Sequence, residues 1–191
     1  LWTQNIQFLP QDISITLSDL SSGMIRDARR ALGQKDKRFS FEVFDCAKIP
    51  HKDCNFDLVI ANHVLFYCED IPAVCNEIQR VLVPGGKLIC STYGSHHMQE
   101  VSQLVQDFDN RIVLSADRLY ERFGRENGAD ILAPYFSDIS WESYNDSLLV
   151  PDAEPLISYI LSCHGNQNQY LLDKYTDFRG FVSRKTKDGF F

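Results

Sequence analysis

Hydrophobic positions in the first half of the chain alternate between short apolar runs and helical spacing. Runs of β-branched and aromatic residues predict strands, and apolar residues three and four apart predict helices. The predicted strands are residues 13–18, 39–44, 56–61 and 87–92. The predicted helices are an opening helix with Trp2, Ile6 and Leu9 on one face, one from Ser21 to a stop at Gly33, and one beginning at Glu69 or Asp70 and ended by Pro84-Gly85-Gly86. Strands that alternate with helices in this way predict a doubly wound α/β fold with a mostly parallel sheet.

The pattern changes after Thr92, where helical spacing dominates. Helices are expected at residues 98–108, 154–163 and 170–184, with a turn of helix at 118–123. Residues 136–144 and 147–150 predict a β-hairpin around Asn145-Asp146. Asp188-Gly189 predicts a turn into a strand that begins at Phe190-Phe191. The 191 residues are expected to form one domain, in which this second half is a helical and hairpin region that covers a substrate.

Composition narrows the class of protein. The net charge of −7 disfavours a duplex nucleic-acid partner, because binding phosphate groups needs a basic surface. The six cysteines form no C-x-x-C pair, which disfavours a zinc ribbon or a thioredoxin-type site. No apolar run is long enough to predict a membrane span, and a cytoplasmic location is the default expectation. The pattern leaves the oligomeric state undetermined.

One long segment carries the most specific pattern. Residues 56–92, FDLVIANHVLFYCEDIPAVCNEIQRVLVPGGKLICST, combine a buried strand, a polar pair, an amphipathic helix, an R-x-L-x-P-G-G turn and a second strand. This run resembles the second half of the class I S-adenosylmethionine (SAM)-dependent methyltransferases. The resemblance implies a three-layer, Rossmann-like sheet and methyl transfer from SAM to a small-molecule acceptor. It also implies that residues 1–92 bind SAM and that residues 93–191 bind the substrate.

Two acidic residues follow predicted strands. Asp19 ends the first, and the resemblance implies that its carboxylate accepts hydrogen bonds from both ribose hydroxyls, with Leu20 beside the adenosine. A local alternative is that Asp19 only caps the helix at Ser21. Asp45 and Cys46 begin the run DCAKIP, and the resemblance implies that they meet the adenine through the Asp45 carboxylate and the Cys46 backbone N–H. The alternative for Asp45 is a solvated loop acid.

Polar residues after the next strands are candidates for the reaction itself. Asn62 is expected beside the methionine part of SAM. His63 is a candidate general base because the pKa of a free histidine lies close to neutral pH, although a packing role is equally compatible with its position. Tyr67, Tyr93 and His96 are candidate substrate residues. The His96-His97 pair has no third ligand at suitable spacing, so no metal site is expected.

One element of the resemblance is absent from the sequence. The family has a glycine-rich turn of the E/D-x-G-x-G-x-G kind, and this chain has ten glycines but no G-x-G. We therefore expect roughly 40–60 residues before Leu1, including a strand between the first and third strands predicted above. A polypeptide limited to these residues is expected to bind SAM poorly. Two rival functions remain open at this point: a non-catalytic binding subunit with the same fold, and an NAD-dependent oxidoreductase.

Overall fold

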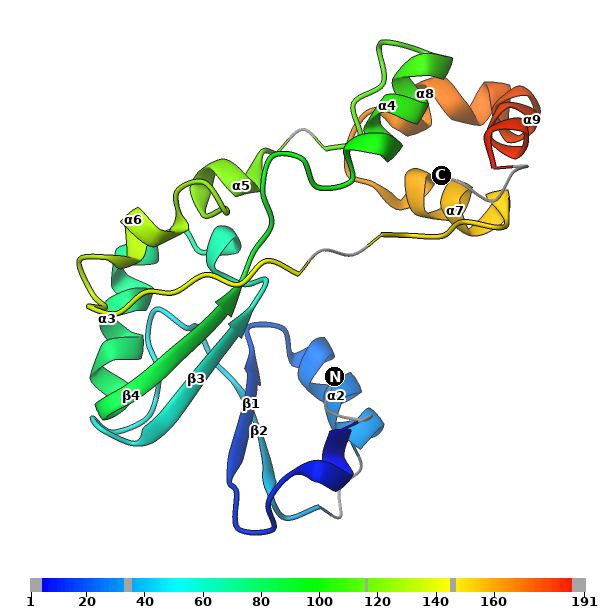
Figure 1. The fold of residues 1–191 in the computed structure, drawn as a ribbon. Helices are drawn as coiled ribbons and strands as arrows, with labels where there is room; N and C mark the ends of the chain where they lie inside the picture. The colour runs from blue at the N-terminus through cyan, green and yellow to red at the C-terminus, as the bar shows by residue number, and fades with distance from the viewer. Residues whose placement is uncertain (1–4, 33–35, 116, 145–146, 187–191) are drawn as a thin grey trace. The chain divides into compact units, whose positions relative to one another are not determined.

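The computed structural model describes residues 5–32, 36–115, 117–144 and 147–186 (Figure 1). The chain forms two compact units, Leu1–Ser91 and Thr92–Phe191. The division falls within one residue of the point where the hydrophobic pattern changes. Four predicted features lie outside the described residues: Trp2, the helix stop at Gly33, the turn at Asn145-Asp146 and the strand start at Phe190-Phe191.

Each described strand of the first unit has one parallel partner (Figure 1). The strands are β1 (Ile15–Asp19), β2 (Phe39–Val43), β3 (Phe56–Asn62) and β4 (Leu82–Ser91). β1 pairs with β2, and β3 pairs with β4. Parallel pairs joined through helices are the predicted α/β arrangement. Within the described residues β1 and β3 do not pair directly, which agrees with the predicted strand order.

β4 is longer than its pattern predicts because it contains the glycine turn. Phe56 pairs with Leu82 and Leu58 pairs with Lys87, so the four residues between Leu82 and Lys87 lie opposite one residue of β3. Gly85 has a φ of 80°, a conformation that costs glycine little and other residues more. The predicted turn is therefore a bulge inside the strand rather than a break before it.

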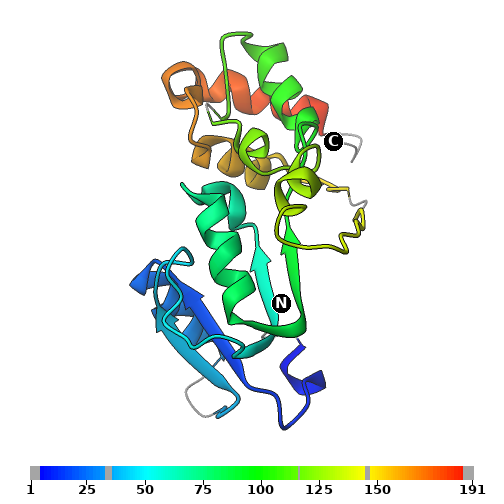
Figure 2. The ribbon, with the colours of Figure 1, turned by 90° about the vertical axis from the view of Figure 1, so that its left-hand side faces the viewer.

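Both helices of the first unit begin at the predicted caps. In α2 (Ser22–Leu32) the Ser21 Oγ accepts a hydrogen bond from the Met24 N–H at 3.3 Å. In α3 (Ile71–Val81) the Asp70 Oδ1 accepts from the Ala73 N–H at 2.9 Å. α2 packs against β1 and β2, and α3 packs against β4 (Figure 2). The buried face of α3 consists of Ile71, Val74, Cys75, Ile78 and Val81.

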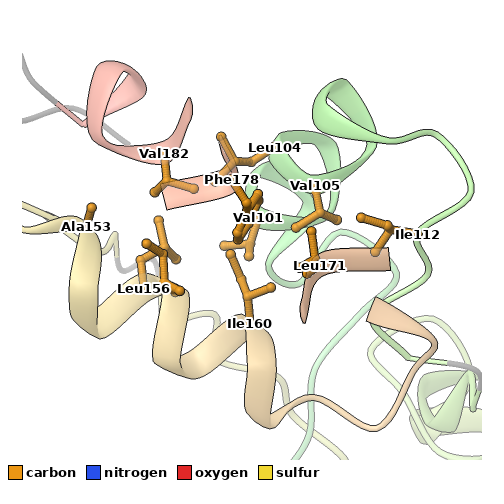
Figure 3. Close-up of a cluster of buried hydrophobic side chains, with 11 residues drawn as sticks. Val101, Leu104, Val105, Ile112, Ala153, Leu156, Ile160, Leu171, Phe178 and Val182 are labelled. Carbon is orange, nitrogen blue, oxygen red and sulfur yellow. The ribbon is translucent and has the colours of Figure 1, made fainter. Parts of the chain in front are cut away.

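Helices make up the second unit wherever it has regular structure among its described residues. They are α4 (Gln99–Phe108), α5 (Leu119–Arg122), α6 (Gly128–Leu132), α7 (Ala153–Ser162), α8 (Gln167–Leu171), η3 (Leu172–Lys174) and α9 (Tyr175–Lys185). Figure 3 shows the buried cluster to which α4, α7, α8 and α9 contribute side chains. The cluster consists of Val101, Leu104, Val105, Ile112, Ala153, Leu156, Ile157, Ile160, Leu171, Phe178 and Val182. These helices therefore share one hydrophobic core.

Three predictions of local structure are wrong. The opening helix is only a 3-10 turn, η1 (Ile6–Phe8), among the described residues. Residues 136–144 and 147–150 contain no strand, so the predicted hairpin does not form there. The predicted helix at 170–184 is divided into α8, η3 and α9. No helix in the described parts of the chain is both long and apolar enough to cross a membrane.

Candidate functional site

Two predicted acids lie at the ends of neighbouring strands. Asp19 is the last residue of β1 and pairs with Val43, the last residue of β2. The Phe44 N–H continues this ladder by donating to the Asp19 carbonyl at 3.3 Å, and Asp45 follows. The carboxyl ends of parallel strands meet at one edge of a sheet, where α/β folds bind their ligands. Asp19 and Asp45 therefore lie at the carboxyl ends of two paired strands, and their roles in binding a ligand stay predictions.

Asp19 also makes a local hydrogen bond of the kind expected if it only caps the helix at Ser21. Its Oδ1 accepts a hydrogen bond from the Ser21 N–H at 2.8 Å, just before α2 begins. The side chain is exposed, and a carboxylate has acceptor capacity beyond one such bond. Leu20, the next residue, is 73% exposed, which places an apolar side chain in water beside the acid. The local bond and a ligand-binding role are compatible.

Asp45 shapes the loop that follows β2. Its Oδ1 accepts from the Ala47 N–H at 2.8 Å, and its carbonyl accepts from the Lys48 N–H at 2.9 Å. The half-buried Cys46 has its Sγ 3.5 Å from the Sγ of Cys68. The hydrogen bond from Cys68 lowers the pKa of Cys46 to about 7, against the opposing effects of burial and the Asp45 charge.

Asn62 and His63 lie where β3 ends. Asn62 pairs with Ser91 of β4, and its Oδ1 is 3.5 Å from the Ser91 Oγ. The His63 N–H donates to the Ser91 carbonyl at 3.2 Å. His63 has a φ of 51°, in the left-handed region that only a few per cent of non-glycine residues adopt. Its ring meets the Phe66 ring edge-on, with the centroids 5.9 Å apart.

Tyr67 is placed by a short helical turn after His63. The turn η2 (Leu65–Tyr67) buries Leu65 and Phe66 and leaves Tyr67 66% exposed. The Phe66 and Tyr67 ring centroids are 4.7 Å apart. The buried neighbour therefore fixes the turn, while the tyrosine ring remains accessible.

Tyr93 and His96 belong to the second unit. The Tyr93 ring lies 4.9 Å from His97 and 6.5 Å from Tyr120, measured between centroids. His96 Nδ1 lies 3.3 Å from the Ser95 Oγ, which in turn is 3.1 Å from Glu126 Oε1. The pKa of Glu126 is lowered, mainly by the hydrogen bond from the Ser95 backbone N–H and also by the hydrogen bond from the Ser95 hydroxyl. This cluster is built by residues 92–97 and 120–126 of the second unit.

Residues 4–90 match a family described as "Methyltransferase domain". This segment is similar to that family and is named the methyltransferase domain after it. The match covers β1, β2, β3, α2, α3 and β4 except its last residue, Ser91, so the α/β expectation and the resemblance stated above are confirmed.

Relatives of the methyltransferase domain act on different acceptors, as their names state. The chain is 30% identical to malonyl-[acyl-carrier protein] O-methyltransferase of Serratia marcescens over 95 residues, which are 50% of this chain and 36% of the relative. It is 26% identical to phosphoethanolamine N-methyltransferase 3 of Arabidopsis thaliana over 162 residues, covering 71% of this chain and 33% of the relative. The chain thus spans about a third of the length of these relatives. A SAM-dependent methyltransferase structure from Methanosarcina mazei matches 63% of this chain and 68% of its own, with a TM-score of 0.44 and 23% identity.

Inside the methyltransferase domain the structure gathers the predicted residues at strand ends. Asp19, Leu20, Asp45 and Cys46 follow the β1–β2 pair, and Asn62 and His63 follow the β3–β4 pair. Tyr93 and His96 lie in the other unit. No group of three or more His, Cys, Asp or Glu side chains suited to a metal ion occurs in the described part of the chain.

Sequence reasoning missed three neighbours in the first unit. Ser91 binds the backbone of His63, and Cys68 contacts Cys46. Arg80 donates from α3 to the Ile49 and His51 carbonyls in the loop after β2, at 2.9 and 2.8 Å. The only sequence signal for these contacts is that residues 46, 68 and 91 all follow or end strands, whose carboxyl ends meet at one edge.

Proposed function

We propose that this protein is a SAM-dependent methyltransferase that acts on a small-molecule acceptor. The observation that carries the proposal is the placement of Asp19 and Asp45 at the carboxyl ends of paired parallel strands, inside the segment that matches the methyltransferase family. Ligands of open α/β sheets bind at that edge. The acidic pair and the exposed Leu20 side chain give the edge both hydrogen-bond acceptors and apolar surface.

The residues present fit the cofactor. When bound, SAM supplies an electrophilic methyl group on its sulfonium. The exposed Asp19 carboxylate offers two acceptor oxygens, which suits a pair of ribose hydroxyls. The exposed Leu20 side chain suits an apolar contact with the adenine ring, and the Asp45 loop suits the polar edge of that ring. Asn62, at the end of β3, suits the methionine part.

His63 is proposed to deprotonate the acceptor, and Tyr67 is proposed to bind it. The Ser91 carbonyl accepts the His63 N–H and holds the left-handed backbone of His63. This contact fixes the backbone position from which the His63 side chain extends. An imidazole placed there can take a proton from an acceptor whose nucleophile is weakly acidic. Tyr67 is proposed as the residue of the methyltransferase domain that binds the acceptor.

A small acceptor is favoured over a nucleic acid by two observations. The net charge of −7 provides no general attraction for phosphate backbones. The match to the phosphoethanolamine methyltransferase extends over 162 residues, well beyond the 87 residues that the family match spans. That relative is named for a small amine, so amines are the first acceptors to assay.

The test is methyl transfer by the full-length protein from SAM labelled in its methyl group. A panel of small amines, alcohols and acyl thioesters is offered, and formation of S-adenosylhomocysteine is measured beside label transfer. We expect turnover with at least one acceptor, and loss of turnover in His63→Ala when the acceptor needs a base. Binding of SAM without turnover on any acceptor would favour the non-catalytic subunit instead. Binding of NAD but not SAM would overturn the proposal.

A further inference from the structure

Two thiols from different loops of the methyltransferase domain lie against each other. Cys46 follows β2, and Cys68 follows the turn η2. Their Sγ atoms are 3.5 Å apart although the residues are separated by 22 positions in the sequence. Both are half-buried, and neither forms a disulfide. The contact therefore joins the loop after β2 to the segment after η2.

The loops are held so that this contact persists. The Cys46 loop is fixed by Asp45, whose Oδ1 accepts the Ala47 N–H at 2.8 Å, and by Glu77, whose Oε2 accepts the Ile49 N–H at 2.8 Å. The Cys68 N–H donates to the Leu65 carbonyl at 3.1 Å, and its Sγ lies 3.6 Å from the Val64 carbonyl. A disulfide has an S–S separation of about 2.05 Å, so the sulfur atoms need to approach by roughly 1.5 Å.

The remaining cysteines with resolved shifts differ in chemical character. Burial raises the pKa of Cys75 to about 11 and also raises the pKa values of Cys90 and Cys163. Cys46 has a pKa of about 7, chiefly because of the Cys68 hydrogen bond. The thiolate is the nucleophilic form of cysteine, so Cys46 is the most reactive of these four near neutral pH.

We propose that Cys46 and Cys68 form a peroxide-sensitive modification site that closes to an intramolecular disulfide. The Cys46 thiolate attacks one oxygen of hydrogen peroxide, the O–O bond breaks, and the leaving hydroxide takes up the proton released by Cys46. The products are a Cys46 sulfenic acid and water. The Cys68 sulfur then attacks the Cys46 sulfur, the S–O bond breaks, and the hydroxide leaves as water with the Cys68 proton. Two thiols and one peroxide thus give one disulfide and two waters.

The consequence is a covalent link between the loops that follow β2 and β3. Cys46 is the residue after Asp45, and Cys68 is the residue after Tyr67. The disulfide would fix the separation between these two loop segments. An effect on SAM binding rests on the proposed function, whereas formation of the disulfide does not.

The experiment treats the reduced full-length protein with an equimolar amount of hydrogen peroxide. Free thiols are counted after unfolding in denaturant, and the linked peptides are identified by mass spectrometry. We expect the loss of two thiols per chain and a peptide pair joined through Cys46 and Cys68. An unchanged thiol count, or a disulfide that joins other cysteines or two chains, would overturn the proposal.

Variants separate the two chemical steps. In Cys68→Ser the first step remains and the second is blocked, so dimedone is expected to label Cys46 as a sulfenic acid. Cys68→Ala provides a second variant if the serine variant folds poorly, as judged by circular dichroism; it is labelled above pH 9, because loss of the Cys68 hydrogen bond moves the pKa of Cys46 toward 9.0. Cys163→Ser is the matched control, since that half-buried thiol lies in the second unit, and it is expected to form the disulfide as the unmodified protein does. Absence of dimedone label on Cys46 in both folded Cys68 variants would contradict the proposed order of attack.

Discussion

The carboxylate of Glu77 accepts a hydrogen bond from the backbone N–H of Ile49, with Oε2 2.8 Å from the amide nitrogen. Arg80, one turn later in α3, donates to the carbonyl of the same residue at 2.9 Å. Arg80 also binds Glu77 through two hydrogen bonds of 2.8 Å each. Both backbone groups of Ile49 are therefore held by one helical ion pair. Because Ile49 lies in the DCAKIP loop, α3 helps to fix the segment that carries Asp45 and Cys46.

Replacing Glu77 by alanine tests this relationship. The Ile49 N–H loses its acceptor and Arg80 keeps only Asp53 as a carboxylate partner, so we expect the Ile49 amide to exchange roughly tenfold faster with deuterium. Asp27→Ala is the matched control, because Asp27 also pairs with an arginine three residues later, but on the exposed surface of α2. Hydrogen exchange followed by NMR measures both. Equal exchange in the two variants would show that the ion pair does not hold the loop.

Asp45, which is proposed to bind the adenine, is expected to contribute less to ligand affinity than Asp19, which is proposed to bind the ribose. Asp45→Ala removes one proposed hydrogen bond to the ligand, whereas Asp19→Ala removes a two-point contact. Calorimetric titration of S-adenosylhomocysteine should therefore give a smaller loss of affinity for Asp45→Ala than for Asp19→Ala. The reverse order would mean that Asp45 makes the dominant contact.

The reactivity of Cys46 should depend on pH through its neighbour. Its pKa of about 7 lies below its ordinary value of 9.0, so alkylation of Cys46 by iodoacetamide should rise through a midpoint near pH 7. Cys68→Ala removes the hydrogen bond and should move the midpoint toward 9.0. Because the pKa of Cys46 is lower in the folded state than in the unfolded state, ionisation of this thiol stabilises the fold. This contribution to folding stability is present above about pH 9 and is lost as the pH falls through 7.

Peptide mapping of the alkylated protein isolates Cys46 from the other thiols. Cys163→Ala should leave the Cys46 midpoint where it is, because Cys163 lies in the second unit. A midpoint near 9 in the unmodified protein would contradict the assigned hydrogen bond.

The core of the second unit depends on Phe178. This side chain is fully buried, and its ring meets Phe108 with the centroids 5.1 Å apart. Phe178→Ala should cost about 3–5 kcal/mol of unfolding free energy through lost burial and the cavity it leaves. Phe181→Ala, which truncates a partly buried neighbour on the same helix, should cost less. Urea denaturation followed by circular dichroism at a helical wavelength compares them, and equal costs would contradict the described packing.

The hydrophobic pattern predicted α3 of the first unit well because the burial of this helix is periodic, whereas the predicted opening helix is only the turn η1. The face of α3 that includes Val74 and Ile78 follows a period of 3.6 and is capped by Asp70, so local sequence and tertiary packing agree. The predicted hairpin failed because alternation alone does not provide a strand with a partner. Trp141 is 46% exposed and Tyr144 is 89% exposed, so these aromatic residues do not form a buried strand face.

The sequence predicted only those parts of the candidate site that lie at the ends of strands. Asp19 and Asp45 could be placed together because parallel strands bring their carboxyl ends to one edge. The contact between Cys46 and Cys68 could not be predicted, because it depends on the paths of two loops and on the contacts of Ile49 with α3. The left-handed backbone of His63 likewise has no signal in the sequence.

The central claim is that Asp19 and its strand edge bind S-adenosyl ligands. The most direct measurement is a calorimetric titration of S-adenosylhomocysteine into the full-length protein, into Asp19→Ala and into the control Asp27→Ala. We expect equal affinity for the unmodified protein and Asp27→Ala, and a loss of about tenfold or more in Asp19→Ala. Unchanged affinity in Asp19→Ala, or no binding by the unmodified protein, would contradict it.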